Sequence, residues 1–195
     1  MHFIFLTRCF TTKNLQRIKD DIKAVFSGSK HTYQHVLLVD MSHALTKDDP
    51  TTTNRFDAFV DNNTKVHYVY NKKDYYMYYA CDDYLATLED QDAYVYFLDD
   101  DNTLKPDFIK VCDTSENIDL IIFKLDNHPH WGNVGCTEGN VDIGNYITKL
   151  NVIKEYKIGD VQSRSSDGLF VEKLRKNKRS ILYINETLGY YNHLA

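Results

Sequence analysis

A chain of 195 residues with 43% hydrophobic and 26% charged residues is long enough to bury a sizeable core as one soluble globular domain. Its net charge of −5 argues against a broad nucleic-acid-binding face, because phosphate backbones are held by clustered Lys and Arg. An anionic ligand such as a nucleotide diphosphate would therefore need a local source of positive charge. A divalent cation is the simplest source.

The cysteines and the N-terminus indicate the compartment. The four cysteines lie far apart without a C-x-x-C pair, which favours buried free thiols over a disulfide framework or a zinc site: Cys9, Cys81, Cys112 and Cys136. The N-terminal apolar run lacks a basic start and is interrupted by Arg8, so it predicts a strand and not a signal peptide. No apolar stretch approaches the roughly 20 residues of a membrane span. We expect a cytoplasmic protein with no transmembrane segment.

In the first half of the chain, short apolar runs alternate with helically spaced apolar residues. The expected strands cover residues 3–6, 36–39, 66–70, 94–98 and 120–123. Helical spacing predicts helices over 15–26 and 74–90, and the Thr-rich stretch 42–54 predicts a loop. Continuous apolar strands separated by helices indicate a mostly parallel α/β sheet covered on both faces.

The second half is less regular. Seven of the eight glycines follow Trp131, and the pattern there predicts loops and short strands around a cleft, apart from a helix running through Val171, Leu174 and Arg175. No linker, repeat or low-complexity tract divides the chain. We therefore expect one domain over residues 1–195, with a nucleotide-binding half to about 125 and an acceptor-side half from about 126.

Polar groups follow the expected strands at the same end. Thr7 and Arg8, Asp40, residues 71–73 with Lys72, and the triplet 99–101 each stand where a strand ends. In open α/β sheets ligands bind beyond the carboxyl ends of the strands, so one shared edge is expected for all four groups.

The triplet Asp99-Asp100-Asp101 has two interpretations. Consecutive acids after an apolar strand suit Mg²⁺ or Mn²⁺, which bind through one or two carboxylates plus substrate phosphates. The alternative is a solvated acidic turn before the helix that Pro106 opens. Alternation along a strand end lets Asp99 and Asp101 share a face while Asp100 points elsewhere.

The segment from Tyr94 to Phe108, in which an apolar strand leads to the acids and then to a proline, resembles the D-x-D region of glycosyltransferase-A enzymes, notably the inverting family 2. The resemblance covers roughly residues 1–125. It implies that Asp101 ligates the metal, that Asp100 contacts the ribose and that Asp99 supports either role. It also implies donor contacts for the first two strand ends, and for a basic group after the third: Thr7, Arg8, Asp40 and Lys72.

Asp167 lies in Ser165-Ser-Asp-Gly168, directly before a helical pattern. A plain helix cap explains this position well. The resemblance implies a second role, because Asp167 is similar to the family's later acid at a helix start, which takes the proton from the attacking hydroxyl. Ser166 stands where the family often has Glu, so the match is partial.

Three further positions complete the expected site. Residues 139–146, with Asn145, resemble the glycine-bearing segment that lines donor and acceptor, although a simple turn fits equally well. His193 resembles the C-terminal histidine that completes the metal site in many such enzymes. Trp131 is expected either as a sugar-stacking platform or as a buried wedge. His128 and His130 have no nearby partner that would complete a second metal site.

The sequence therefore predicts a glycosyltransferase-A domain that moves a hexose from a nucleotide sugar, most simply a UDP-sugar, to a glycan or glycoprotein hydroxyl with Mn²⁺ or Mg²⁺. Inversion of the anomeric centre follows from the resemblance alone. A retaining enzyme of the same fold, a nucleotidyltransferase and a non-catalytic sugar-binding module are the alternatives. Residues 3–13 contain no glycine, whereas nucleotidyltransferases usually have a Gly-rich first loop.

Overall fold

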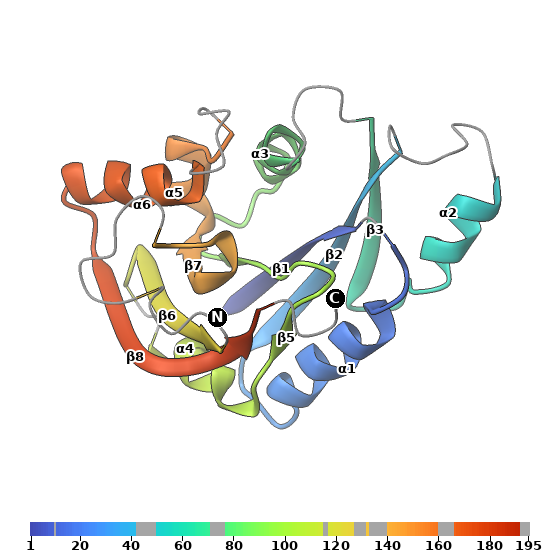
Figure 1. Ribbon diagram of the computed structural model, residues 1–195, viewed down its shortest axis with the longest axis horizontal. Coiled ribbons are helices and arrows are strands. Elements are labelled where there is room, and N and C mark those ends of the chain that lie inside the picture. Colours follow the sequence, from blue (N-terminus) through green and yellow to red (C-terminus); the bar gives the residue numbers. More distant parts are fainter. Residues whose placement is uncertain are drawn as a thin grey trace.

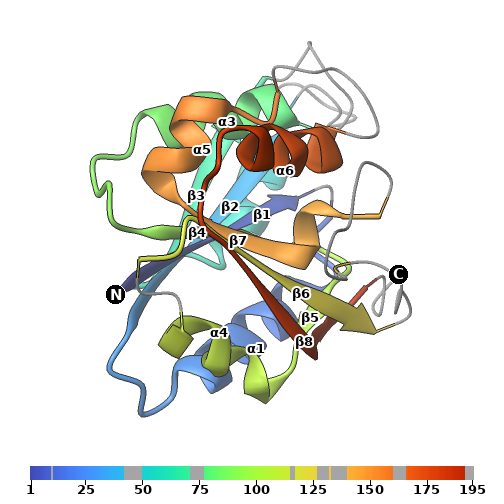
Figure 2. The same ribbon diagram turned by 90° about the vertical axis from the view of Figure 1, so that its left-hand side faces the viewer.

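The computed structural model shows one eight-stranded sheet with helices on both faces (Figures 1 and 2). It describes the chain apart from residues 10, 42–49, 71–76, 115–116, 127–131, 133–139, 160–165 and 192–195, and the side chains of 50–52. The strand order is β3-β2-β1-β4-β7-β6-β8-β5. No helix among the described residues is long and apolar enough to cross a membrane.

The first half follows the expected alternation. Its elements are β1 (His2–Cys9), α1 (Leu15–Phe26), β2 (Thr32–Asp40), α2 (Pro50–Asp57), β3 (Thr64–Val69), α3 (Tyr78–Ala86) and β4 (Tyr94–Phe97). Strands β1 to β4 pair in parallel, which confirms the prediction from their continuous apolar runs. The loop expected to residue 54 is wrong from residue 50 on, because Pro50 opens α2 despite the threonines that follow.

The second half contains more regular structure than expected. The first half continues through β5 (Thr103–Leu104), η1 (Pro106–Phe108), α4 (Ile109–Thr114) and β6 (Leu120–Asp126). The elements of the second half are η2 (Ile143–Asn145), β7 (Tyr146–Lys149), α5 (Leu150–Tyr156), α6 (Ser166–Lys176) and β8 (Ile181–Tyr190). Strand β7 runs antiparallel to both β4 and β6, and β8 runs parallel to β6. The prediction of short strands is wrong for β8, which spans ten residues.

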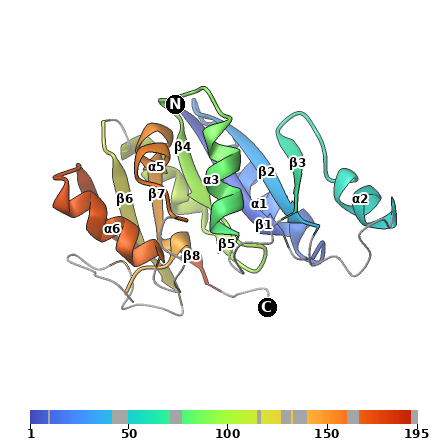
Figure 3. The ribbon, with the colours of Figure 1, turned by 90° about the horizontal axis from the view of Figure 1, so that it is seen from above.

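Two apolar layers hold the sheet between its helices. Helices α3, α5 and α6 cover one face, and α1 and α4 cover the other (Figures 2 and 3). Alternate residues of each strand feed the two layers, as Leu6 and Phe5 of β1 do. Helix α1 buries the five apolar residues that its helical spacing singles out: Leu15, Ile18, Ile22, Val25 and Phe26. Cys9, Cys81 and Cys112 are buried, and Cys136 lies outside the described residues.

Candidate active site

The register of β1 and β4 places Arg8 next to Asp99. Leu6 pairs with Phe97 in a parallel ladder, so two residues further along each chain bring Arg8 and Asp99 side by side at the carboxyl edge of the sheet. The Arg8 guanidinium donates two hydrogen bonds to the Asp99 carboxylate, from Nε to Oδ1 at 2.7 Å and from Nη2 to Oδ2 at 2.5 Å. The Tyr78 ring lies 5.2 Å from the guanidinium carbon. The positive charge of Arg8 therefore balances the negative charge of Asp99.

Asp100 anchors the acidic turn to the segment before α1. Its carboxylate accepts a hydrogen bond from the backbone N–H of Thr11 at 3.2 Å, and its carbonyl accepts one from the Asn14 side chain at 2.9 Å. The Asn102 N–H donates to the Asp99 carbonyl and closes the turn. These bonds fix the direction in which the three acids leave β4.

Asp101 has no such compensation. It is half-buried, and no ion pair involves it within the part of the chain that the structure describes. Burial and the neighbouring carboxylates of Asp99 and Asp100 raise its pKa to about 6. A carboxylate crowded by like charges without a matching cation is the kind of ligand that a divalent ion stabilises.

The described residues do not by themselves form a complete metal cage. They contain no cluster of three or more His, Cys, Asp and Glu side chains placed to hold an ion. Hard cations such as Mg²⁺ commonly bind through one or two carboxylates, with water and substrate phosphates as the remaining ligands. Asp101 beside the Arg8–Asp99 pair fits this mode. His193, the other predicted ligand, lies outside the described residues.

A second pair of acids comes from the other half of the chain. Asp167, in the first turn of α6, is 5% exposed and accepts a hydrogen bond from the Gly168 N–H at 2.9 Å. Burial raises its pKa to about 6, although the Gly168 amide and Arg8 oppose the rise. A buried carboxyl that titrates near neutrality has the properties of a general base.

Asp142 is the acid that sequence reasoning missed. Its carboxylate accepts the Gly144 N–H at 2.8 Å while its own N–H donates to Asn145, so the two residues cap η2 reciprocally. Burial, Asp99 and Asp167 raise its pKa to about 7, which places it within electrostatic reach of both acid groups. The D-x-x-N spacing signals the cap, but no local pattern reveals which distant carboxylates lie nearby.

Tyr146, the first residue of β7, lies near Asp142 and Asp167. Its hydroxyl is fully buried and has no hydrogen-bond partner among the described residues, and its ring stacks on Phe170 at 5.8 Å. Burial and then Asp167, Tyr78 and Asp142 raise its pKa, so the hydroxyl lies within electrostatic reach of the two acids of the second half. A buried hydroxyl without a hydrogen-bond partner lowers the stability of the folded chain, so a ligand that bonded this hydroxyl would remove that cost.

The other predicted residues occupy varied places. Asp40 closes β2 at the carboxyl edge and is buried. Thr7 is fully buried, and its hydroxyl bonds His35 at 2.8 Å, toward α1 and away from Arg8. The Asn145 amide is engaged internally, since it donates to the Phe123 carbonyl and accepts from the Asp142 N–H. No hydrogen bond among the described residues joins the side chain of Thr7 or Asn145 to the acidic triplet.

Lys72, Trp131 and His193, with the weaker candidates His128 and His130, lie outside the described residues. Their expected contacts with donor, acceptor and metal stay predictions.

The fold is supported by similarity to solved structures and not by similarity of sequence. No protein-family model matches the chain, and no curated protein matches it in sequence. A mannosyltransferase from Pyrobaculum calidifontis, solved with GDP-Man and Mn²⁺, superimposes with a TM-score of 0.67 at 10% identity over 98% of this chain and 56% of its own. S. aureus TarS 1-349 gives 0.59 at 16% identity over 97% and 60%.

A third similar structure belongs to another enzyme class. The 4-diphosphocytidyl-2C-methyl-D-erythritol synthase of Anaerococcus prevotii gives a TM-score of 0.61 at 11% identity, over 99% of this chain and 88% of its own. The chain has the glycosyltransferase-A fold. It spans less than two thirds of the two transferases and most of the synthase. The fold prediction is confirmed, and the chemistry depends on the site.

Proposed function

We propose that the chain is a metal-dependent glycosyltransferase that takes a hexose from a nucleotide sugar. The observation that carries the proposal is Asp101, a half-buried carboxylate that lacks an ion pair among the described residues and stands beside Arg8–Asp99 at the carboxyl edge of the sheet. Asp101 would hold a divalent ion there, and the ion would supply positive charge to the leaving diphosphate. The manganese in the similar mannosyltransferase supports this proposal.

The roles divide between the two halves of the chain. Asp101 and His193 hold the ion, Asp100 and Asp40 bind the nucleoside, and Lys72 lies near the base or phosphate. Arg8 holds Asp99 in place, and the Thr7 backbone lines the first donor loop. Trp131 and the segment of Asn145 line the acceptor.

Asp167 is the proposed general base. Its buried position at the start of α6 and its raised pKa let it take the proton of an acceptor hydroxyl near neutral pH. The hydroxyl oxygen attacks the anomeric carbon while the nucleoside diphosphate leaves from the opposite side, which inverts the configuration. UDP is the donor nucleotide that we test first, and GDP is next because of the similar mannosyltransferase.

A screen of UDP- and GDP-hexoses with Mn²⁺ or Mg²⁺ tests the proposal. Release of nucleoside diphosphate and sugar, dependent on the metal and lost in Asp101→Asn, is the expected result. NMR of the anomeric product separates inversion from retention. Unchanged metal-dependent turnover by Asp101→Asn would contradict the proposed metal site.

A nucleotidyltransferase is the second candidate, favoured by the synthase of similar length. Such an enzyme would join a nucleoside triphosphate to a sugar phosphate and release pyrophosphate. Pyrophosphate release from CTP, GTP or UTP with hexose 1-phosphates, together with inertness toward every nucleotide sugar, would favour it. The absence of glycine from residues 3–13 argues against it.

A further inference from the structure

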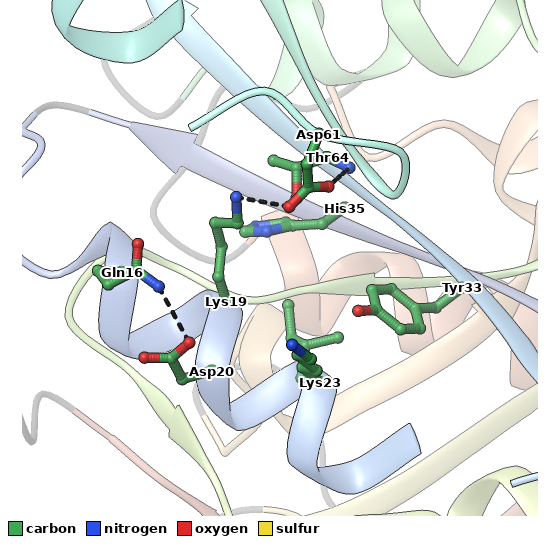
Figure 4. A pocket seen from close by; sticks show the side chains of 9 residues that line it. Gln16, Lys19, Asp20, Lys23, Tyr33, His35, Asp61 and Thr64 are labelled. Atoms are coloured by element: carbon green, nitrogen blue, oxygen red, sulfur yellow. Dashed lines mark hydrogen bonds and ion pairs between the residues drawn. The ribbon is translucent and has the colours of Figure 1, made fainter. Parts of the chain in front are cut away.

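A polar hollow lies on the α1 side of the sheet, away from Asp101, Asp142 and Asp167. It is a pocket of about 130 Å³ between α1, β2 and the start of β3 (Figure 4). An adjoining groove of about 520 Å³ shares Lys23, Tyr33 and Asp61 with it. His35 in this pocket precedes Asp40 by five residues along β2, a separation of about 16 Å along an extended strand. The hollow is therefore distinct from the candidate active site.

The buried side of the pocket has unused hydrogen-bonding capacity. His35 is 1% exposed, its Nε2 bonds the Thr7 hydroxyl, and its Nδ1 has no partner within the described part of the chain. Burial, followed by the nearby Lys19, lowers the pKa of His35 to about 3, so the ring is neutral. Figure 4 shows this ring next to the ion pair between Lys19 and Asp61, whose atoms lie 2.8 Å apart. A neutral ring offers either a donor or an acceptor at Nδ1.

The charges of the lining balance. Two lysines, Lys19 and Lys23, face two carboxylates, Asp20 and Asp61. Lys19 is already held by Asp61 and by the Phe59 carbonyl. This balance disfavours a phosphate, which needs surplus positive charge, and a divalent cation, which needs surplus carboxylates.

The remaining lining consists of groups that recognise neutral hydroxyls. Amides and hydroxyls both donate and accept hydrogen bonds, and they come from α1 and the residue after it, from β2, and from the turn before β3 and its first residue: Gln16, Ser27, Tyr33, Asn62, Asn63 and Thr64. The Tyr33 ring is half-buried and packs on the buried Phe26 ring at 5.0 Å, so Tyr33 offers the groove an apolar face with a polar tip. Sugars present this combination of hydroxyls and C–H faces.

We propose that the hollow is an accessory binding site for a neutral oligosaccharide, which holds an acceptor chain away from its reacting end. The role of the site in catalysis rests on the proposed function, because a second binding site for the glycan raises the effective concentration of the acceptor at a transferase. Binding itself needs neither the metal nor the acids at the carboxyl edge.

Binding is tested by NMR on the ¹⁵N-labelled chain, with maltotetraose and the β-1,4-linked tetramer of N-acetylglucosamine as probes. The backbone amide signals of residues 16–23 and 61–64 are expected to shift on addition of at least one tetramer. The same shifts are expected in Asp101→Asn. Shifts produced by inorganic phosphate in place of both tetramers, or tetramer shifts confined to residues near Asp101 and Asp167, overturn the proposal.

The variant Asn62→Ala/Asn63→Ala removes two exposed amides without changing the backbone bonds of their turn, because Asn63 uses only backbone atoms there. It is expected to weaken tetramer binding about tenfold. Asn151→Ala, an exposed asparagine on α5, is the matched control and should bind as the parent does. Equal affinities for all three proteins would contradict the proposal.

The outcomes separate this inference from the proposed function. Tetramer shifts at residues 16–23 and 61–64 in a chain that turns over no nucleotide sugar leave the accessory site standing and reject the transferase. Metal-dependent transfer without those shifts supports the transferase and rejects the accessory site. If both hold, the double variant raises KM for a tetrasaccharide acceptor and leaves KM for a monosaccharide acceptor unchanged.

Discussion

Asp167, the proposed general base, also has a structural role. One carboxylate oxygen accepts the Gly168 amide at the start of α6, while burial raises the pKa of the group to about 6. Bonding to the first turn of α6 and action as a base are therefore compatible roles for the Asp167 carboxylate. Because a base must be ionised to accept a proton, its pKa controls activity at the acidic end of the pH range.

Asp167→Asn is predicted to lower transfer by about 1,000-fold and to leave donor affinity nearly unchanged. In the parent, transfer falls about tenfold per pH unit below about pH 6, because the protonated carboxyl cannot act as base. Steady-state kinetics from pH 5 to 8 with donor binding by calorimetry checks both. A parallel loss of binding and transfer would reject the role of base.

Asp142 destabilises the metal-free protein when it is ionised. Its pKa is about 7 in the folded protein, against an ordinary value of 3.8 for an aspartate, so the folded state binds the proton more tightly than the unfolded state does. The stability contributed by the bound proton is therefore present at low pH and is lost as the pH rises from about 4 through about 7.

Asp142→Asn is therefore predicted to stabilise the chain by about 1–3 kcal/mol at pH 8 and to change little at pH 4. Asparagine keeps the oxygen that caps η2. Urea unfolding in EDTA at the two pH values measures the difference, and Asp92→Asn, an exposed acid before β4, is the control. Destabilisation at pH 8 would show that the charge of Asp142 is compensated.

Individual elements differ in how much of them the sequence predicts. Strands β1, β2 and β4 and helix α1 follow from local patterns, since continuous apolar runs and 3.6-residue spacing coincide with their buried positions. Strand β8 escapes prediction because Asn185 and Glu186 interrupt it and most of its residues are only partly buried. Its register shifts against β6 are set by tertiary contacts.

The backbone at position 132, close to β6, depends on a glycine. Gly132 has φ +75°, and a Cβ added there would lie 2.2 Å from the Phe123 carbonyl oxygen of β6. Gly28 has φ +74°, yet a Cβ added to it would meet no described atom within 4 Å. The two positions therefore share the backbone strain of a left-handed residue and differ in steric contact.

Gly132→Ala is predicted to destabilise the chain by about 3 kcal/mol, whereas Gly28→Ala should cost about 1 kcal/mol for the backbone alone. Urea denaturation of both variants measures the difference. Equal losses would mean that the segment at Gly132 moves away from β6 without strain.

At the scale of the whole molecule, parallel strand order gathers the functional groups. The sequence predicts that Arg8, Asp40 and the triplet share an edge, and the structure places them at the carboxyl ends of neighbouring strands. The approach of Asp142 and Asp167 to that edge could not be predicted, because it depends on the crossing of β7 beside β4 and on where α6 begins. The direction of the Thr7 side chain also escapes prediction, since alternation along β1 turns its hydroxyl to His35.

In this account the proposed active site at the carboxyl edge and the hollow beside α1 bind opposite ends of one substrate. The carboxyl edge carries the acids, and the α1 side carries balanced charges, amides and aromatic rings. The proposed donor site depends on a metal ion at Asp101, because the net charge of −5 otherwise disfavours binding of a diphosphate.

The most direct test is calorimetric binding of UDP and GDP to the parent, Asp101→Asn and Asp92→Asn, each with and without Mn²⁺. The account predicts that Mn²⁺ strengthens binding of one nucleotide to the parent and to Asp92→Asn by at least about tenfold, and that Asp101→Asn loses this gain. Nucleotide binding that is equally strong without Mn²⁺, or an undiminished gain in Asp101→Asn, would contradict it.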